Sequence, residues 1–343
     1  MLILNDLHIG ATRQGGTTLN SQQELKQYLR DSLQHLLEQH PNEHVVINGD
    51  FFDGFNVENT EIVAAYDILA KHLETGKLTM IAGNHDHHAN GNKMSSWHLL
   101  CHLLRRVGFV LLDHTDGLSY VRSGVWVIPH MLNQDLFDAE IEKALQEDVR
   151  SIDSYLLLHC NYQNGWAEHS DHSLNLSEKQ TNDLLEAGWT LILGHEHIAR
   201  SFHDGKVFIT GCQFPSSVAD CIGSGYKRAL HLESGELRSL TTWGIENYAE
   251  ADWRNPNVGR ERFIRITGEA TAAEAADVIK TVAKLRQLSD AFVITNAVKI
   301  EGQAAIDEMG TCSLEEVRGF DVLSAIYENL TEKEIETVKG LLQ

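Results

Sequence analysis

The stretch from Leu78 to Asp86 constrains the possible folds of this chain more than any other part of it. Leu78 to Ala82 form an apolar run with the composition of a buried strand. Gly83, Asn84, His85 and Asp86 follow at once. Packing does not explain these polar side chains, because such groups cost free energy when they are buried without partners. Open α/β sheets place their sites just beyond the carboxyl ends of strands, so we expect a site here.

Four other apolar runs end in the same kind of residue. Asp6 and His8 follow the run Leu2 to Asn5, and Asp50 follows Val45 to Ile47. His159 follows Tyr155 to Leu158, and His195 and His197 follow Thr190 to Leu193. Amphipathic segments between the runs predict helices over Ser21 to Gln39, Thr60 to Leu73, Ser95 to Val107, Gln134 to Val149 and Ser177 to Ala187. Closing strands are expected over Lys206 to Thr210, Arg228 to Leu232 and Glu236 to Thr242. The alternation predicts a layered α/β fold.

The residues at the strand ends form a set of metal ligands without sulfur. Carboxylate, imidazole and amide groups together suit manganese, iron or zinc, whereas magnesium and calcium prefer oxygen alone. Seven candidates exceed the needs of one tetrahedral zinc. They suit two ions about 3.5–4 Å apart that share a bridging carboxylate. The candidates are Asp6, His8, Asp50, Asn84, His159, His195 and His197.

Together the strand ends resemble the five-part signature of calcineurin-like metallophosphoesterases, over residues 1 to about 240. The matching segments are Asp6-Leu7-His8, Gly49 to Asp53, Gly83 to Asp86, His159 and Gly194 to His197. The resemblance implies one ion held by Asp6, His8, Asp50 and His197, and a second held by Asp50, Asn84, His159 and His195, so that Asp50 bridges them. It also implies that His85 is the catalytic histidine. Asp86 either orients His85 or caps the following turn.

The chain beyond His197 is similar to the nuclease subunit of SbcCD-type complexes, which repair DNA double-strand breaks, and to its phage relatives. The similar residues there are Phe208 to Pro215, Lys227 and Arg228. Earlier in the chain, Val125 to Pro129 also sits where that family has a strand ending in proline. Asp53 departs from the pattern, because many members have histidine there. The resemblance implies a nuclease that uses two divalent ions, manganese first, with Mg²⁺, Fe²⁺ or Zn²⁺ as alternatives. Water activated between the ions would attack the phosphodiester.

The same resemblance implies what this nuclease acts on and with which partners. It would be a 3′–5′ exonuclease and single-strand endonuclease in DNA repair, recombination and replication. Its expected partners are DNA, an ABC-type ATPase subunit (SbcC-like) and a second copy of the chain. The helix Thr60 to Leu73 has an apolar face of Ile62, Tyr66, Leu69 and Leu73 that either packs in the core or forms the dimer interface. The resemblance favours the dimer.

The sequence predicts four regions along the chain. Residues 1–243 form the catalytic domain, and the Asn-rich residues 244–258 form a linker. Residues 259–312 form a small α+β domain, and residues 313–343 form helices. The resemblance implies that the small domain caps DNA and that the helices bind the ATPase subunit. Arg254, Arg260, Arg262 and Arg265 are the densest basic cluster. They either contact DNA phosphates or form an ordinary solvated face.

The composition sets limits on function and compartment. A net charge of −21, from 28 Lys and Arg against 49 Asp and Glu, opposes nucleic-acid binding unless bound cations or a partner supply positive charge. Five cysteines without C-x-x-C spacing suit a reducing compartment. A strand at the first residues and the lack of a long apolar run predict a soluble cytoplasmic protein without a signal peptide. The sequence lacks a P-loop motif, so we expect no ATP hydrolysis by this chain.

One other function remains open beside the nuclease. The chain is either a nuclease or a stand-alone metallophosphodiesterase or phosphatase that acts on small phosphoesters or cyclic nucleotides. A third reading, an inactive scaffold, is disfavoured because every ligand position is filled. Fold and metals alone do not fix the substrate.

Overall fold

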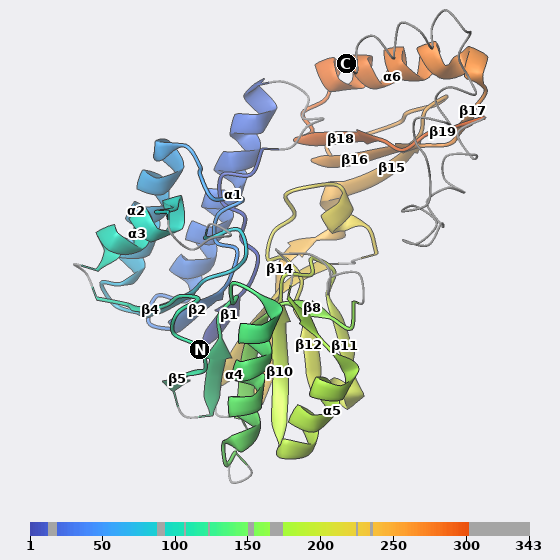
Figure 1. Cartoon of the computed structure of the whole chain (residues 1–343). Helices are drawn as coiled ribbons and strands as arrows, with labels where there is room; N and C mark the ends of the chain where they lie inside the picture. Colours follow the sequence, from blue (N-terminus) through green and yellow to red (C-terminus); the bar gives the residue numbers. More distant parts are fainter. Residues whose placement is uncertain are drawn as a thin grey trace, which may run out of the picture.

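The protein is described from a computed structural model that covers residues 1–12, 19–87, 93–105, 108–122, 124–149, 154–164, 174–223, 226–233 and 236–301. Over these residues, two six-stranded sheets stack with helices outside them, and a smaller sheet follows in the chain (Figure 1). The predicted layered α/β fold is confirmed.

The first sheet has the strand order β14-β13-β1-β2-β3-β4. Its strands are β1 (Leu2–Leu4), β2 (His44–Asn48), β3 (Lys77–Ile81), β4 (Val110–Leu112), β13 (Tyr226–Glu233) and β14 (Glu236–Gly244). Strands β1 to β4 are parallel, and β13 and β14 close the sheet as an antiparallel pair. Helices α1 (Leu19–Gln39), α2 (Asn59–His72) and α3 (Ser96–Leu104) pack on its outer face, at the left of Figure 1.

The second sheet has the strand order β11-β12-β10-β7-β6-β5. Its strands are β5 (Ser119–Arg122), β6 (Val125–Ile128), β7 (Ser154–His159), β10 (Trp189–Gly194), β11 (Arg200–Phe202) and β12 (Val207–Ile209). Helices α4 (Gln134–Gln146) and α5 (Glu178–Ala187) cover its outer face. A short parallel pair, β8 (Asn161–Tyr162) and β9 (Asn175–Leu176), follows β7. Single 3₁₀ turns lie at His203–Gly205, Ala219–Cys221, Ile245–Asn247 and Ala272–Glu274.

The side chains alternate along the central strands and so build three apolar layers. Ile3, Val46, Leu157 and Ile192 lie in the core between the two sheets. Their neighbours in sequence point the other way, under the helices. Strands with both faces buried read as continuous apolar runs, and this is why the sequence shows no alternation there.

The C-terminal part has its own sheet and core. Strands β15 (Tyr248–Asp252), β16 (Phe263–Thr267) and β18 (Val293–Asn296) are parallel, and α6 (Ala275–Leu288) lies over them at the top of Figure 1. A short pair, β17 (Glu269–Ala270) and β19 (Lys299–Ile300), runs beside them. The predicted linker over residues 244–258 is wrong, because it contains β15. Residues 302–343, with the end of the predicted capping domain and the predicted C-terminal helices, lie outside the described residues.

The apolar face of α2 is used inside the chain. Ile62 and Leu69 are buried in the core beneath the helix, and Tyr66 and Leu73 pack against the same core. Of the two predicted uses of this face, the structure shows packing in the core, and a homodimer stays a prediction. No helix among the described residues is both long and apolar enough to cross a membrane. Cys101, Cys160, Cys212 and Cys221 are free and buried, and Cys312 lies outside the described residues.

Candidate metal centre

Parallel pairing brings the ends of five strands to one edge of the two sheets. In the first sheet, β1, β2 and β3 are neighbours, and Asn48 pairs with Ile81. In the second sheet, β7 and β10 are neighbours, and His159 pairs with Gly194. The polar residues that follow these strands therefore meet across the sandwich, as expected for strand ends that point the same way.

The turns that carry the ligands have a strained backbone. Asp6, His8, Asp50 and His195 have φ between 47° and 87°, which is the left-handed region that residues other than glycine rarely adopt. Strain of this kind persists only where the surroundings enforce it, and it gathers at functional sites. Gly49 also lies in the left-handed region, and a Cβ atom there would overlap the ring of His159. Only glycine fits this position.

A first group of ligands consists of Asp6, His8 and His197. One ligand atom of each lies within 4.8 Å of the others. The Nε2 atoms of His8 and His197 face each other at 2.9 Å. The carboxylate of Asp6 accepts the backbone N–H of His195 at 3.0 and 3.1 Å.

A second group consists of Asp50, His159 and His195, again within 4.8 Å. Asn84 belongs to it, because its Oδ1 lies 3.1 Å from His159 Nε2 and 2.9 Å from His195 Nδ1. The two groups adjoin, since His159 Nδ1 is 4.0 Å from Asp6 Oδ1. All seven predicted ligands are thus gathered in two groups, and these differ from the two predicted sets in that Asp50 is grouped only with the second. That Asp50 bridges both ions stays a prediction.

The chemistry of both groups fits cations. The hydrogen on His197 Nδ1 is donated to Asp220, and His8 Nδ1 lies 3.4 Å from the Asp53 carboxylate. The two Nε2 lone pairs therefore converge, and they repel unless a proton or a cation lies between them. Burial lowers the pKa of His197, but the Asp220 carboxylate more than offsets this and raises it.

The carboxylates of the centre are buried beyond the reach of water. Burial raises the pKa of Asp6, because the charged form loses its solvation. Burial alone would lower the pKa of His159, but the charges of Asp50 and Asp6 raise it to about 9. Two desolvated carboxylates among imidazoles call for positive charge, which divalent ions supply.

Groups outside the ligand set fix the orientation of two ligands. His159 donates its Nδ1 hydrogen to the carbonyl of Asn48 at 3.0 Å, which leaves Nε2 for the centre. His197 donates its Nδ1 hydrogen to Asp220 at 2.7 Å, and Lys227 donates from Nζ to the carbonyl of His197 at 2.8 Å. The sequence did not single out Asn48 or Asp220, because no strand-end pattern marks their role.

His85 lies at the open side of the centre. Its side chain is 40% exposed, and its Nε2 is 3.9 Å from Asp50 Oδ2. Its Nδ1 hydrogen is donated to the carbonyl of Asp53 at 2.7 Å. Asp86 does not orient it, because the Asp86 carboxylate instead accepts the backbone N–H of Gly83 at 2.9 Å and lies near those of Phe51 and Phe52 at 3.4 Å. Asp86 therefore closes the turn Gly83–Asp86 that precedes it, and its contacts show neither the orientation of His85 nor a cap of the following turn.

A third group of potential ligands is His197, Cys212 and Asp220. The ammonium of Lys227 lies among them, because it contacts the carbonyl of His197 and also interacts with Cys212. Lys227 is fully buried. A second cation here would meet this charge, so the group supports the centre rather than forming a third metal site.

The predicted basic cluster is partly neutralised within the chain. Arg254 pairs with Glu274 at 3.1 Å and Arg265 with Glu250 at 3.1 Å. Arg262 donates to the carbonyl of Asp290 at 2.6 Å, and Arg260 is exposed. The cluster therefore offers less free positive charge than its sequence suggests, and its contact with DNA stays a prediction.

The family comparison agrees with this geometry. A family model described as calcineurin-like phosphoesterase matches residues 1–209. This span contains all seven ligands and His85. No curated protein matches the chain.

Proposed function

The chain belongs to the calcineurin-like phosphoesterase family of metal-dependent phosphoester hydrolases, and from this premise we propose that it is a two-metal DNA nuclease. It would act as the nuclease subunit of an SbcCD-like repair complex. The observation that carries the proposal is the pair of adjoining ligand groups with a half-exposed histidine at their open side. Such a centre suits hydrolysis of a phosphodiester too large to enter a closed pocket.

The side chains divide the chemistry between them. Bound divalent ions would activate water and neutralise the charge of the phosphate. Asp6, His8, Asp50, Asn84, His159, His195 and His197 would hold them. His85 donates its Nδ1 hydrogen to the carbonyl of Asp53, so its Nε2 is left for the substrate and, in the imidazolium form, would deliver its proton to the leaving oxygen. Such general-acid catalysis is typically worth about 10²–10⁴-fold in rate.

DNA is the proposed substrate because a separate sheet follows the catalytic fold. The resemblance of Phe208 to Pro215 to SbcCD-type nucleases implies that this sheet caps bound DNA. The net charge of −21 opposes an unaided grip on the duplex. We therefore also propose an ABC-type ATPase partner that supplies the basic surface and binds residues 313–343. The metal would be manganese, with other divalent ions as substitutes.

A second candidate is a stand-alone phosphodiesterase that acts on small phosphoesters. The pairing of Arg254 and Arg265 with glutamates favours it, because these side chains are then less available to DNA phosphates. In this case the C-terminal sheet would limit access to the centre.

One assay separates the candidates. The full-length chain in manganese is given end-labelled single- and double-stranded DNA and, separately, bis-p-nitrophenyl phosphate. Asp50→Ala is the inactive control, because it removes a buried ligand. Cleavage of DNA and of the ester supports the nuclease, and cleavage of the ester alone supports the second candidate. If neither is cleaved although two ions bind, both candidates are rejected.

A further inference from the structure

Asp220 lies beside the metal centre without belonging to the ligand set. It sits in the 3₁₀ turn Ala219–Cys221, and its side chain is 4% exposed. Its two carboxylate oxygens have different partners. Oδ1 accepts the Nδ1 hydrogen of His197 at 2.7 Å. Oδ2 accepts the backbone N–H groups of Ser216 and Ser217, each at 2.8 Å, and the hydroxyl of Ser216 at 3.2 Å.

This arrangement leaves Asp220 only one way to face His197. The two backbone N–H groups are donors that cannot turn away, so an oxygen must lie in front of them. The other oxygen then faces the ring and requires a hydrogen on Nδ1. His197 consequently presents the lone pair of Nε2 toward His8 and Asp6, where the first group of ligands converges.

We propose that Asp220 is a positioning residue that selects the tautomer of His197 and so makes the first metal site competent. Lys227 completes the support, because its buried ammonium holds the carbonyl of His197 at 2.8 Å. The ring and the backbone of one ligand are thus fixed by two separate side chains. The inference rests on the metal centre of the proposed function, but not on DNA as the substrate.

An isosteric variant tests the proposal sharply. In Asp220→Asn, the single oxygen must still face the N–H groups of Ser216 and Ser217, so the amide NH₂ faces His197. Nδ1 then has to accept, and the hydrogen moves to Nε2, where it blocks the lone pair that the metal needs. Loss of a carboxylate partner of a ligating histidine typically costs roughly 10–100-fold in metal affinity. We expect a loss of this size at one of two manganese sites.

A truncating variant separates tautomer control from structural support. Asp220→Ala removes the NH₂ group as well as the carboxylate, so neither tautomer of His197 is imposed. It also leaves two backbone donors without their acceptor, so it should destabilise the fold more than Asp220→Asn does. We therefore expect the two variants to rank in opposite order: Asn is worse for manganese affinity and Ala is worse for unfolding free energy.

The measurements are manganese titration calorimetry and long-range ¹H–¹⁵N spectra of the metal-free, ¹⁵N-histidine-labelled full chain. The spectra should show His197 with its hydrogen on Nδ1 in the wild type and on Nε2 in Asp220→Asn, with His197→Gln identifying the signals. Asp113→Asn is the matched control, because Asp113 also accepts from two histidine rings, those of His98 and His114. It should leave both manganese sites intact.

Three results would overturn the proposal. They are an unchanged tautomer in Asp220→Asn, two sites of wild-type affinity in that variant, or equal losses of affinity in the Asn and Ala variants. A wild type that binds no manganese would instead reject the proposed function. The spectra of the metal-free protein would still decide whether Asp220 selects the tautomer.

Discussion

At the scale of single residues, the ligands are held in place by backbone that cannot relax. Asp6, His8, Asp50 and His195 each occupy the left-handed region, and a non-glycine residue there costs about 1–3 kcal/mol. The fold offsets this cost through the packing of the strands behind the turns. The ligands are consequently oriented before a cation arrives, and binding does not have to order them.

His85 is the residue for which binding and chemistry should separate most clearly. We expect His85→Asn to bind two manganese ions as tightly as the wild type, because His85 lies outside both ligand groups. Its cleavage of end-labelled DNA should fall about 10²–10⁴-fold, because the leaving sugar oxygen loses its proton donor. Calorimetry and initial rates measure the two effects, with the exposed His102→Asn as control. Unchanged turnover would remove His85 from the mechanism.

Gly49 shows that a residue without a side chain can be as necessary as a ligand. In Gly49→Ala, the new Cβ overlaps the ring of His159, and the residue keeps an unfavourable φ of 86°. We expect a loss of about 1–3 kcal/mol in unfolding free energy and weaker manganese binding, because the ring has to move. Urea unfolding and calorimetry measure both. Gly54→Ala is the control, because its Cβ would meet nothing within 4 Å. Equal behaviour of the two variants would contradict this reading.

At the scale of elements, the central strands, the edge strand β14 and the longer helices follow from the sequence, whereas the shorter edge strands do not. Apolar runs such as that of β3 mark buried strands because both faces are covered. β4 and β5 were not predicted, because they are short edge strands with exposed positions such as Val110 and Tyr120. β15 falls in the predicted linker because its Asn-rich surroundings conceal a strand that, among the described strands, pairs with β16 alone.

Within the metal centre, the ligands could be predicted from the sequence, whereas the residues that orient them could not. Its ligands were predictable because each follows an apolar run. Asn48 and Asp220 were not, because their partners His159 and His197 lie 111 and 23 residues away along the chain. Only the folded sheets bring these pairs together.

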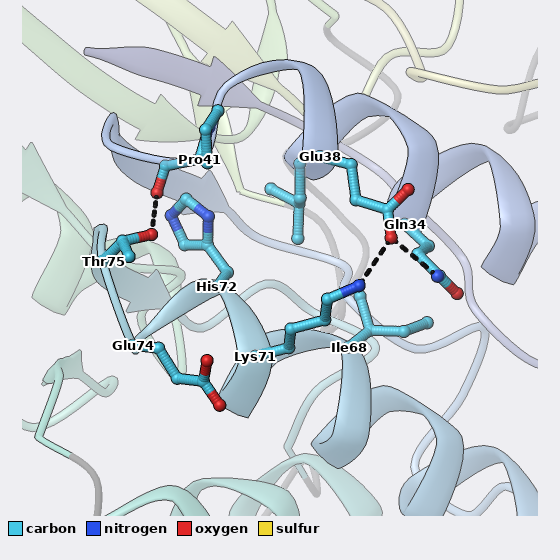
Figure 2. Close-up of a pocket in the computed structure, with 9 residues that line it drawn as sticks. Gln34, Glu38, Pro41, Ile68, Lys71, His72, Glu74 and Thr75 are labelled. Atoms are coloured by element: carbon cyan, nitrogen blue, oxygen red, sulfur yellow. Dashed lines mark hydrogen bonds and ion pairs between the residues drawn. The ribbon is translucent and has the colours of Figure 1, made fainter.

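The contact between α1 and α2 contains a poorly compensated polar group. His72 is 5% exposed, and neither ring nitrogen makes a hydrogen bond of good geometry, although backbone groups of Lys77 and Glu43 interact with the ring. It lines a cavity of about 170 Å³ beside the Lys71–Glu38 ion pair and the hydrogen bond from Thr75 to Pro41 (Figure 2). Burial lowers its pKa below 6.5. Below pH 6.5, His72 therefore binds a proton in the unfolded chain but stays neutral in the folded chain. The unfolding free energy consequently falls as the pH falls.

His72→Leu should remove both the cost of the buried ring nitrogens and the loss of stability at low pH. We expect its unfolding free energy to exceed that of the wild type by about 1 kcal/mol at pH 8, because the poorly paired nitrogens are gone. The excess should be constant above pH 6.5 and should grow as the pH is lowered from 6.5 to 5. Urea unfolding across this range measures it. His102→Leu, an exposed histidine on α3, should show no such growth. A constant excess at all pH values would mean that His72 is not held neutral.

At the scale of the whole molecule, the small sheet is joined to the catalytic fold by aromatic contacts. The ring of Tyr28, on α1, lies 6.3 Å from that of Phe263 and 5.2 Å from that of Phe292. Trp243, at the end of β14, lies 6.4 Å from Phe263. Phe263 and Phe292 belong to the same apolar core as α1. These contacts therefore fix the position of the small sheet on α1. Such a fixed position is what the small sheet would need in order to hold substrate over the metal centre.

Tyr28→Ala should weaken the contact between α1 and the small sheet without changing the metal centre. Loss of the two ring contacts should cost about 1–2 kcal/mol, which shifts an opening equilibrium roughly 5–30-fold. We expect faster proteolytic cleavage within residues 244–258 and slower cleavage of DNA, while hydrolysis of bis-p-nitrophenyl phosphate stays at the wild-type rate. Hydrolysis of the small ester needs only the metal centre, whereas cleavage of DNA would also need the small sheet in its position on α1. Gln23→Ala, an exposed position on the same helix, is the control. If proteolysis accelerates but DNA cleavage does not slow, the sheet is seated on α1 without taking part in substrate binding.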